Sequence, residues 1–162
     1  MTRTLSLIML LSVLLACNKI DQPKRIQPGE SLPVFSIRTS TGENIDNNSF
    51  NNGEGLIVFF HTGCPDCVKE LNSLQSFYEK YSSTIKIILI SRAQPASEIE
   101  KYWKEKGYTM PYSAQEDRSV YELFSNTGIP FAVFTVNGKV KNTWDDKVMF
   151  SEEEYLKLKN NK

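Results

Sequence analysis

Cys64 and Cys67 are separated by Pro65 and Asp66, and this Cys-Pro-Asp-Cys motif is the part of the sequence best suited to chemistry. At the start of a helix, residues i and i+3 lie next to each other, so two sulfur atoms at this spacing can reach bonding distance. The first sulfur would lie beside unpaired backbone N–H groups and the positive end of the helix dipole, which favour the thiolate. We therefore expect Cys64 to attack a disulfide and Cys67 to resolve the mixed disulfide.

The residues beside the two cysteines could tune this chemistry. Pro65 suits the first turn of a helix, because the N–H group that it lacks would have no partner there. Asp66 places a negative charge beside the Cys64 sulfur, which opposes its ionisation and favours a reducing pair. His61 is the one histidine in the chain. Histidine titrates near neutral pH, so His61 either assists the reaction or simply packs at the end of a strand.

Two thiols at this spacing also have other uses. A structural zinc site needs about four Cys or His ligands, and the chain offers only Cys64, Cys67 and His61 besides Cys17. We therefore expect no zinc. A permanent structural disulfide would close a very short loop and stabilise the chain little. A copper-delivery site, built from the two thiolates with or without His61, is the alternative to redox chemistry. The redox cycle itself requires no cofactor.

The elements around the motif are those that a redox site needs. Residues 56–60 (LIVFF) form a continuous apolar run, which predicts a strand buried on both faces. A second such run covers residues 85–90. Between them, apolar residues three and four apart predict an amphipathic helix that starts at the motif; they are Val68, Leu71, Leu74, Phe77, Tyr78 and Tyr81. Strand, helix and strand in this order imply a parallel pair, and a Cys-x-x-Cys motif at its strand-to-helix turn is a strong redox signal.

The rest of the chain alternates between helix and strand patterns. Apolar spacing predicts helices over residues 97–106 and 117–126. It also predicts a strand over 131–136, which an Asn-Gly turn joins to an antiparallel partner over 139–144. The residues expected to face the core are Ile99, Tyr102 and Trp103 in the first helix and Val120, Leu123 and Phe124 in the second.

The two ends of this region also carry patterns. Residues 32–37 and 43–46 predict the two arms of a hairpin, and the Asn- and Gly-rich stretch 47–55 predicts a loop. Ser151 has capping-box spacing to Glu154 and opens a last helix. This order of elements predicts an α/β fold, in which helices cover both faces of a mixed central sheet.

The first residues differ in character from the rest. Residues 1–16 combine a positive start with a short apolar run, which is too short to span a bilayer and is typical of a secretory signal. An uncleaved anchor or a buried helix is the alternative. Leu-Leu-Ala-Cys at the end of this run resembles the bacterial lipobox, in which the cysteine, here Cys17, becomes the lipidated first residue of the mature protein. We predict a signal peptide over 1–16, a polar tether over 17–27 and one folded domain over 28–162.

The overall charge argues against one class of function. The chain has 162 residues, with 19 Lys and Arg against 19 Asp and Glu, so its formal net charge is zero. It contains no long basic run. Nothing in this pattern indicates binding to nucleic acid.

Several stretches together resemble one known family. Residues 56–67 (LIVFFHTGCPDC), followed by 69–71 (Lys-Glu-Leu), resemble the active-site stretch of TlpA-like thioredoxins, which belong to the wider redoxin and AhpC/TSA superfamily. Residues 127–130 (Thr-Gly-Ile-Pro) resemble the cis-proline loop of that fold, and 137–140 resemble the hairpin after it. The resemblance covers nearly all of residues 28–162.

The resemblance has structural implications. It implies a thioredoxin-like fold with an N-terminal β-hairpin and with an extra helix between Cys67 and Pro130. It also implies that Pro130 follows a cis peptide bond and faces the two cysteines. In this family, the backbone of the preceding residue, here Ile129, pairs with a segment of the substrate.

The resemblance also implies a function. The protein would be a thiol–disulfide oxidoreductase that reduces disulfides of exported proteins through Cys64 and Cys67. A membrane protein with two thiols would supply the electrons. Lipidation at Cys17 would anchor the protein to a membrane outside the bacterial cytoplasm, facing the periplasm. A copper or haem-maturation chaperone that uses the cysteine pair for binding is the alternative.

The sequence departs from the family pattern in several places. Val58 occupies the position of a buried Asp in thioredoxins, and Gly63 replaces a common Trp. Residues 91–94 (Ser-Arg-Ala-Gln) contain no acid, where relatives often have a Glu, so no proton acceptor for Cys67 is assigned. Peroxiredoxins place a Thr three residues before their reactive cysteine; His61 stands there instead, which argues against peroxidase chemistry.

Overall fold

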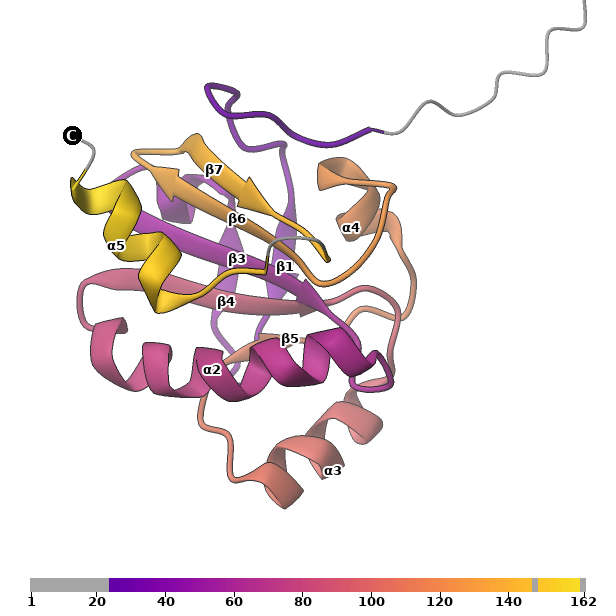
Figure 1. Cartoon of the computed structure of the whole chain (residues 1–162). Helices are drawn as coiled ribbons and strands as arrows, with labels where there is room; N and C mark the ends of the chain where they lie inside the picture. The colour runs from indigo at the N-terminus through magenta and orange to yellow at the C-terminus, as the bar shows by residue number, and fades with distance from the viewer. Residues whose placement is uncertain (1–23, 147–148, 161–162) are drawn as a thin grey trace, which may run out of the picture.

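The computed structural model describes residues 24–146 and 149–160, and its centre is a five-stranded mixed sheet (Figure 1). The strands are β3 (Glu54–Phe60), β4 (Ile85–Ser91), β5 (Tyr112–Ser113), β6 (Phe131–Val136) and β7 (Lys139–Trp144). Their order is β5-β4-β3-β6-β7, with β3 parallel to β4 and antiparallel to β6. The predicted mixed sheet and its parallel pair are therefore confirmed.

Strand β3 is central because both of its faces are apolar. Leu56, Val58 and Phe60 point into one hydrophobic core. Ile57 and Phe59 point into the other. Since successive side chains of a strand alternate between faces, a continuous apolar run fits only a strand that is covered on both sides.

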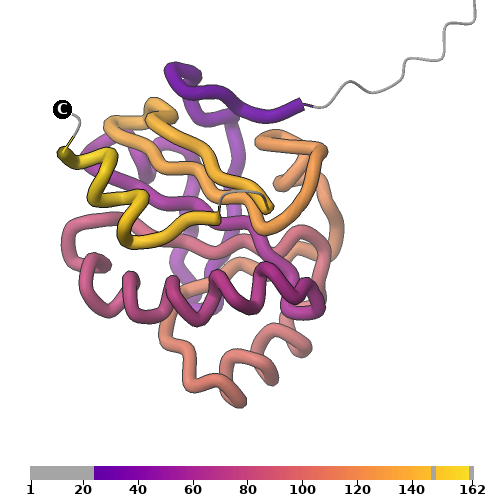
Figure 2. Tube along the Cα trace, in the orientation of Figure 1, coloured from indigo at the N-terminus to yellow at the C-terminus, as the bar shows by residue number. Residues whose placement is uncertain are grey.

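Three helices cover the first face of the sheet, as the ribbon and the chain trace show (Figures 1 and 2). They are α2 (Pro65–Tyr81), α3 (Ala96–Lys106) and α5 (Glu152–Asn160). Their buried residues form one core with that face of the sheet; they include Leu71, Leu74 and Phe77 of α2, Ile99 and Trp103 of α3, and Tyr155 of α5. Helix α3 is the extra helix that the family resemblance implied.

Shorter elements cover the second face. They are the antiparallel hairpin of β1 (Ser36–Arg38) and β2 (Asn44–Asp46), the 3-10 helix η1 (Asn47–Phe50) and the helix α4 (Ser119–Phe124). Their aromatic rings form the second core with Phe59, whose ring centre lies 5.0 Å from that of Phe124 and 5.4 Å from that of Tyr121. Helices therefore lie on both faces, as expected.

Several predicted elements differ in extent. Strand pairing in the N-terminal hairpin begins at Ser36 instead of residue 32, and β5 was not predicted. The expected loop 47–55 contains η1, which Asp46 and Ser49 close with a capping box. The helix predicted over 117–126 covers only Ser119–Phe124.

The inward face of α4 was also predicted wrongly in one position. Tyr121 is fully buried together with Phe124, whereas Leu123 is 38% exposed. Tyr121 and Phe124 lie three residues apart and so share the face that packs on Phe59. Leu123 lies off that face.

The fold extends further toward the N-terminus than predicted. We expected a tether up to residue 27, but Ile26 is buried and its N–H donates to the carbonyl of Phe124 at 2.8 Å. The N–H of Asn126 donates to the carbonyl of Lys24 at 3.0 Å. Residues 24–27 therefore belong to the domain. The predicted signal peptide and Cys17 lie outside the described residues.

In 24–146 and 149–160, no helix combines the length and the apolar character that crossing a membrane requires.

Candidate active site

The two cysteines lie at the turn between β3 and α2, as the sequence indicated. Cys64 is the residue that caps α2, and its Sγ accepts a hydrogen bond from the backbone N–H of Cys67 at 3.3 Å. Both cysteines are free thiols; Cys64 is half-buried and Cys67 is fully buried. The accessible sulfur of Cys64 can meet a substrate, whereas the sulfur of Cys67 can be reached only from within the site.

A buried acid, Glu70, lies one helical turn after Cys67. Its side chain is inside the core, where Oε1 accepts a hydrogen bond from the backbone N–H of Phe150 at 2.8 Å. Its other oxygen, Oε2, is buried with no hydrogen-bond partner in the described part of the chain. Burial raises the pKa of Glu70 to about 7, and the hydrogen bond from Phe150 only partly opposes this rise.

Cys67 and Glu70 influence each other's charge. Burial raises the pKa of the Cys67 thiol, and the nearby Cys64 thiol and Glu70 carboxylate act in the same direction. The Cys67 thiol therefore stays protonated until a base takes its proton. Glu70 is the acid that the sequence analysis did not assign to this role. The available signal was a Glu within the apolar face of the helix, between Cys67 and Leu74.

The cis-proline loop faces the cysteines. The peptide bond between Ile129 and Pro130 is cis, as the family resemblance implied. The carbonyl of Ile129 accepts a hydrogen bond from the Cys64 thiol at 3.7 Å. The fold thus brings the two cysteines next to the peptide unit of Ile129 and Pro130, more than sixty residues further along the chain.

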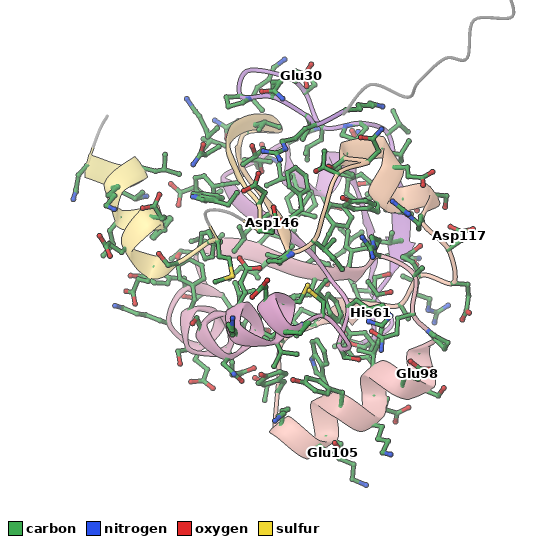
Figure 3. The ribbon with its side chains drawn as sticks, turned by 45° about the vertical axis from the view of Figure 1, so that its right-hand side comes forward. Glu30, His61, Glu98, Glu105, Asp117 and Asp146 are labelled. Atoms are coloured by element: carbon green, nitrogen blue, oxygen red, sulfur yellow. The ribbon has the colours of Figure 1, made fainter. Side chains whose placement is uncertain are left out.

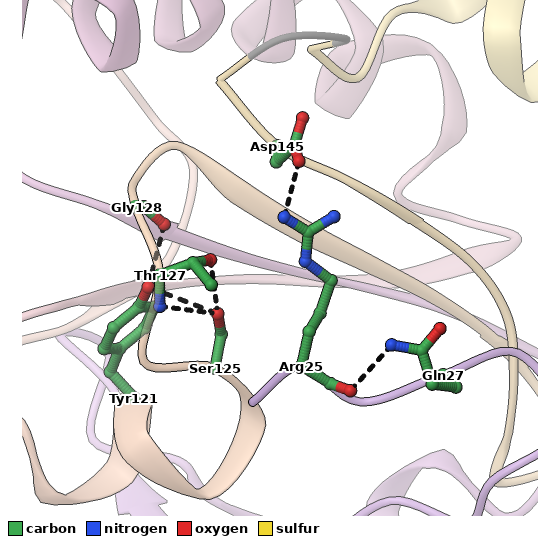
Figure 4. A network of polar contacts seen from close by, with 7 residues as sticks. All are labelled: Arg25, Gln27, Tyr121, Ser125, Thr127, Gly128 and Asp145. Atoms are coloured by element: carbon green, nitrogen blue, oxygen red, sulfur yellow. Dashed lines mark hydrogen bonds and ion pairs between the residues drawn. The ribbon is translucent and has the colours of Figure 1, made fainter. Parts of the chain in front are cut away.

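Side-chain hydrogen bonds hold the loop before Pro130 (Figure 4). The hydroxyl of Tyr121 donates to the carbonyl of Gly128 at 2.8 Å. The backbone N–H of Thr127 donates to the hydroxyl of Ser125 at 3.2 Å. Nearby, the guanidinium of Arg25 pairs with Asp145 at 2.5 Å. Helix α4 and the N-terminal segment therefore both support the position of the loop.

The three predicted neighbours of the cysteines have different surroundings. Pro65 is the first residue of α2 and is exposed. Asp66 forms an ion pair with Lys69 at 2.9 Å on the solvent side of the helix. His61 lies close to the start of α2 (Figure 3). Its Nδ1 accepts a hydrogen bond from the N–H of Gly63 at 2.9 Å, so a neutral ring carries its proton on Nε2.

The segment after β4 contributes two residues that the sequence analysis passed over. Gln94 is buried; its Oε1 accepts from the N–H of Thr62 at 3.0 Å, and its Nε2 donates to the hydroxyl of Thr62. It therefore ties the turn before Cys64 to the segment that leads into α3. Arg92 is half-buried and lies at the edge of the site.

An open groove of about 410 Å³ runs beside Cys64. The turn before α2 forms one wall through His61 and Gly63, and the cis-proline loop forms another through Gly128 and Ile129. Arg92 is the one charged side chain among the described residues that line it, apart from the titratable His61. A polypeptide segment that binds here would meet the Cys64 sulfur and the Ile129 backbone together.

In the part of the chain that the structure describes, His, Cys, Asp and Glu side chains form no group of three or more that could bind an ion.

Comparison with protein families gives a match over most of the chain. A family model described as the AhpC/TSA family matches residues 28–141. This range includes the cysteine motif, the extra helix and the cis-proline loop.

Individual proteins are also similar. The chain is 33% identical over 111 residues to sporulation thiol-disulfide oxidoreductase A of Bacillus subtilis strain 168, a match that spans 65% of this chain and 66% of that protein. It is 23% identical over 145 residues to thiol-disulfide oxidoreductase ResA of Geobacillus thermodenitrificans strain NG80-2, covering 86% of this chain and 83% of that protein.

Solved structures share the fold. The thioredoxin domain of a thiol-disulfide oxidoreductase from Bacteroides vulgatus superposes with a TM-score of 0.70 at 19% identity, covering 84% of this chain and 98% of that one. The thioredoxin-like fold is therefore confirmed.

Proposed function

Because the chain belongs to the AhpC/TSA family and carries two thiols at the start of α2, we propose that it is a thiol–disulfide oxidoreductase. The main support is the contrast between the accessible Cys64 sulfur, which faces the cis-proline loop, and the buried Cys67 sulfur behind it. Such a pair can attack a disulfide from outside and resolve the product from inside.

The reaction begins when the Cys64 thiolate attacks one sulfur of a substrate disulfide. The substrate S–S bond breaks, the other substrate sulfur leaves as a thiolate, and a mixed disulfide forms with Cys64. Cys67 then loses its proton and attacks the Cys64 sulfur, which releases the second substrate thiol. Two electrons have passed to the substrate, and the protein is left with a Cys64–Cys67 disulfide. The proposed cycle uses no cofactor.

We assign to Glu70 the role of accepting the proton of Cys67. A base works best when its pKa is close to the working pH, and burial raises the pKa of Glu70 to about 7. A Glu70 carboxylate also repels a Cys67 thiolate. Loss of the Cys67 proton to Glu70 avoids two neighbouring negative charges in the core.

The direction and place of the reaction are part of the proposal. We propose that the protein works as a reductase of exported proteins and is itself reduced by a membrane protein with two thiols. Lipidation of Cys17 would hold it at the membrane, facing the periplasm. The support is the sequence of residues 1–17 and the relatives' names as thiol-disulfide oxidoreductases.

Trapping experiments test the two roles. In Cys67→Ser, substrate proteins should accumulate as mixed disulfides through Cys64, which non-reducing electrophoresis detects. Cys64→Ser should trap none. Equal trapping by both variants would contradict the assignment of attacker and resolver. Stoichiometric copper in the reduced, purified protein, without turnover of disulfides, would instead favour the chaperone alternative.

The anchor needs its own test. The mature protein should begin at Cys17 and partition into the detergent phase, whereas Cys17→Ala should prevent processing or release the protein. A mature chain that still begins at Met1 would contradict lipidation.

A further inference from the structure

The groove beside Cys64 contains one cation that the proposed reaction does not use. Arg92 follows directly after β4, and its backbone N–H donates to the carbonyl of Phe60 at 2.9 Å. Phe60 ends β3, just before the turn that leads to Cys64. The backbone of Arg92 is therefore fixed relative to the attacking cysteine.

The side chain of Arg92 is also held in place. Its guanidinium carbon lies 5.9 Å from the centre of the Tyr121 ring, just within the limit of about 6 Å for a cation–π contact. Tyr121 is fully buried, and its hydroxyl donates to the carbonyl of Gly128, which also lines the groove. The same aromatic ring thus supports the guanidinium and the cis-proline loop.

No acidic side chain in the described part of the chain neutralises the charge of Arg92. Among the described residues, no carboxylate forms an ion pair with it. Asp66, the acid nearest to Cys64 in sequence, is already paired with Lys69. Asp146 lies beside Gly128, where a Cβ would come within 3.8 Å of its carboxylate, but it is not among the residues that line the groove.

His61 gives the groove a second hydrogen-bond donor. Since its Nδ1 accepts from Gly63, the neutral ring presents an N–H group as its remaining polar atom. The groove thus offers a guanidinium and an imidazole N–H. Both are hydrogen-bond donors, and a carboxylate is the group that accepts from such donors with a gain of charge attraction.

We propose that Arg92 makes the protein select disulfides with an acidic side chain next to the cysteine that Cys64 attacks. This inference rests on the proposed function and names a substrate class for it. The carboxylate would pair with the guanidinium as the substrate backbone meets Ile129, which brings the substrate sulfur to Cys64. The chemical step is unchanged: the substrate S–S bond breaks, and one substrate sulfur leaves as a thiolate.

The test uses the full chain, reduced in advance and mixed with short peptide disulfides in a single turnover. The peptides have blocked ends and carry Glu, Gln or Lys next to the cysteine; a Gln peptide with a free terminal carboxylate separates that group from a side chain. The neutral compound 2-hydroxyethyl disulfide serves as a reference. We expect the Glu peptide to react roughly two to five times faster than the Gln peptide, and the Lys peptide to be slowest. High salt should reduce these ratios.

Two variants and a matched control locate the effect. Arg92→Gln should make the three peptides react at equal rates, and Arg92→Glu should reverse their order. Arg118→Gln should keep the original order, because Arg118 also lies 5.8 Å from the Tyr121 ring centre but pairs with Glu122 and does not line the groove. For each variant, the peptide rates are divided by its own rate with 2-hydroxyethyl disulfide, so that a general change in the reactivity of Cys64 cancels. Circular dichroism shows that the variants are folded.

Other outcomes would overturn the inference. Equal rates for the Glu and Lys peptides with the wild-type protein would contradict it, as would an unchanged order in Arg92→Gln. If only the free terminal carboxylate accelerates the reaction, the selected group is a chain end and the inference is wrong. Failure to reduce even 2-hydroxyethyl disulfide would refute the proposed function itself.

Discussion

Glu70 couples the charge of the site to the stability of the fold. Its pKa is about 7 in the folded protein, against a usual value of 4.5. The folded state therefore prefers the neutral acid, and ionisation costs stability. The full stability is present below pH 4.5 and is lost progressively as the pH rises through 7.

This coupling predicts the behaviour of Glu70→Gln. Gln cannot ionise, so the variant should lack the loss of stability between about pH 4.5 and pH 7, which amounts to about 3 kcal/mol in the wild type. Urea unfolding at pH 4, 6 and 8 measures the difference. The exposed Glu79→Gln on the same helix is the control and should keep the wild-type profile. Parallel profiles for wild type and Glu70→Gln would contradict the raised pKa.

The same substitution tests the catalytic role. Without a carboxylate to accept the proton of Cys67, mixed disulfides with Cys64 should form at the normal rate but resolve more slowly, by roughly 10²- to 10⁴-fold, the usual contribution of a general base. Stopped-flow measurement of both steps across pH 6–9 separates them. Normal resolution in Glu70→Gln would assign the proton to another acceptor.

Asp66 and its partner Lys69 predict opposite effects on the reduction potential. The Asp66 carboxylate repels the negative sulfur of a reduced Cys64, and Lys69 partly screens this repulsion. Asp66→His should therefore make the pair more oxidising, by about 5–20 mV, and Lys69→Gln should make it more reducing. Equilibration with glutathione buffers measures both. A potential that stays constant in the two variants would show that Asp66 is screened by solvent.

At the scale of elements, η1 and β3 fit together through one glycine. Gly55 in β3 has no side chain, and the ring of Phe50 from η1 occupies that space: an added Cβ would lie 2.3 Å from Phe50 Cδ1 and 2.9 Å from Thr135 Oγ1. Both neighbours are buried in the core. They cannot move away without disturbing the central strand.

This packing predicts that Gly55→Ala destabilises the protein. The free energy of unfolding should fall by about 1–3 kcal/mol, because the new methyl group displaces the Phe50 ring from a filled core. Chemical denaturation measures the change. Gly128→Ala is the matched control, since its Cβ would meet only Asp146 at an ordinary 3.8 Å. If the two variants were equally stable, the tight contact between η1 and β3 would be wrong.

The elements that the sequence predicted well are those with strong apolar periodicity. The run 56–60 and the helix that starts at Cys64 are read directly from local patterns. Helix α4 and strand β5 are short, so few residues contribute to the periodic pattern that would predict them. Contacts with residues distant in sequence determine whether such short elements form. Tyr121 points inward because its ring packs on Phe59 and its hydroxyl donates to the carbonyl of Gly128. Neither contact can be read from the sequence.

The site likewise contains residues that local sequence patterns predict and residues that only the folded structure identifies. Cys64 and Cys67 were predicted from spacing, and Pro130 from a family resemblance. Glu70 was missed because only the burial of its carboxyl group distinguishes it from other acids on helix surfaces. Arg92 was missed because it belongs to no sequence motif. Only the path of the chain after β4 brings it near Cys64.

At the scale of the whole molecule, the N-terminal segment joins the fold beside the cis-proline loop. Lys24 and Ile26 pair with residues 124–126, which lead into the loop, and the guanidinium of Arg25 lies 5.6 Å from the centre of the Phe131 ring, just after Pro130. The position where the proposed tether would enter the domain is thus close to the proposed substrate site. Residues 24–27 lie outside the family match, which begins at residue 28.

This arrangement predicts different results for two N-terminal truncations. A chain that begins at Lys24 should keep the stability and the rate of disulfide reduction of the longer chain. A chain that begins at Pro28 should lose about 2–3 kcal/mol of unfolding free energy, because it loses the buried Ile26 side chain. Its rate with peptide disulfides should fall more than its rate with 2-hydroxyethyl disulfide, since the cis-proline loop contacts only the larger substrate.

Arg25→Gln separates the ion pair with Asp145 from the burial of Ile26 and should cost less than about 1 kcal/mol. Equal stability and equal peptide rates for both truncations would show that residues 24–27 merely rest on the surface and do not support the loop.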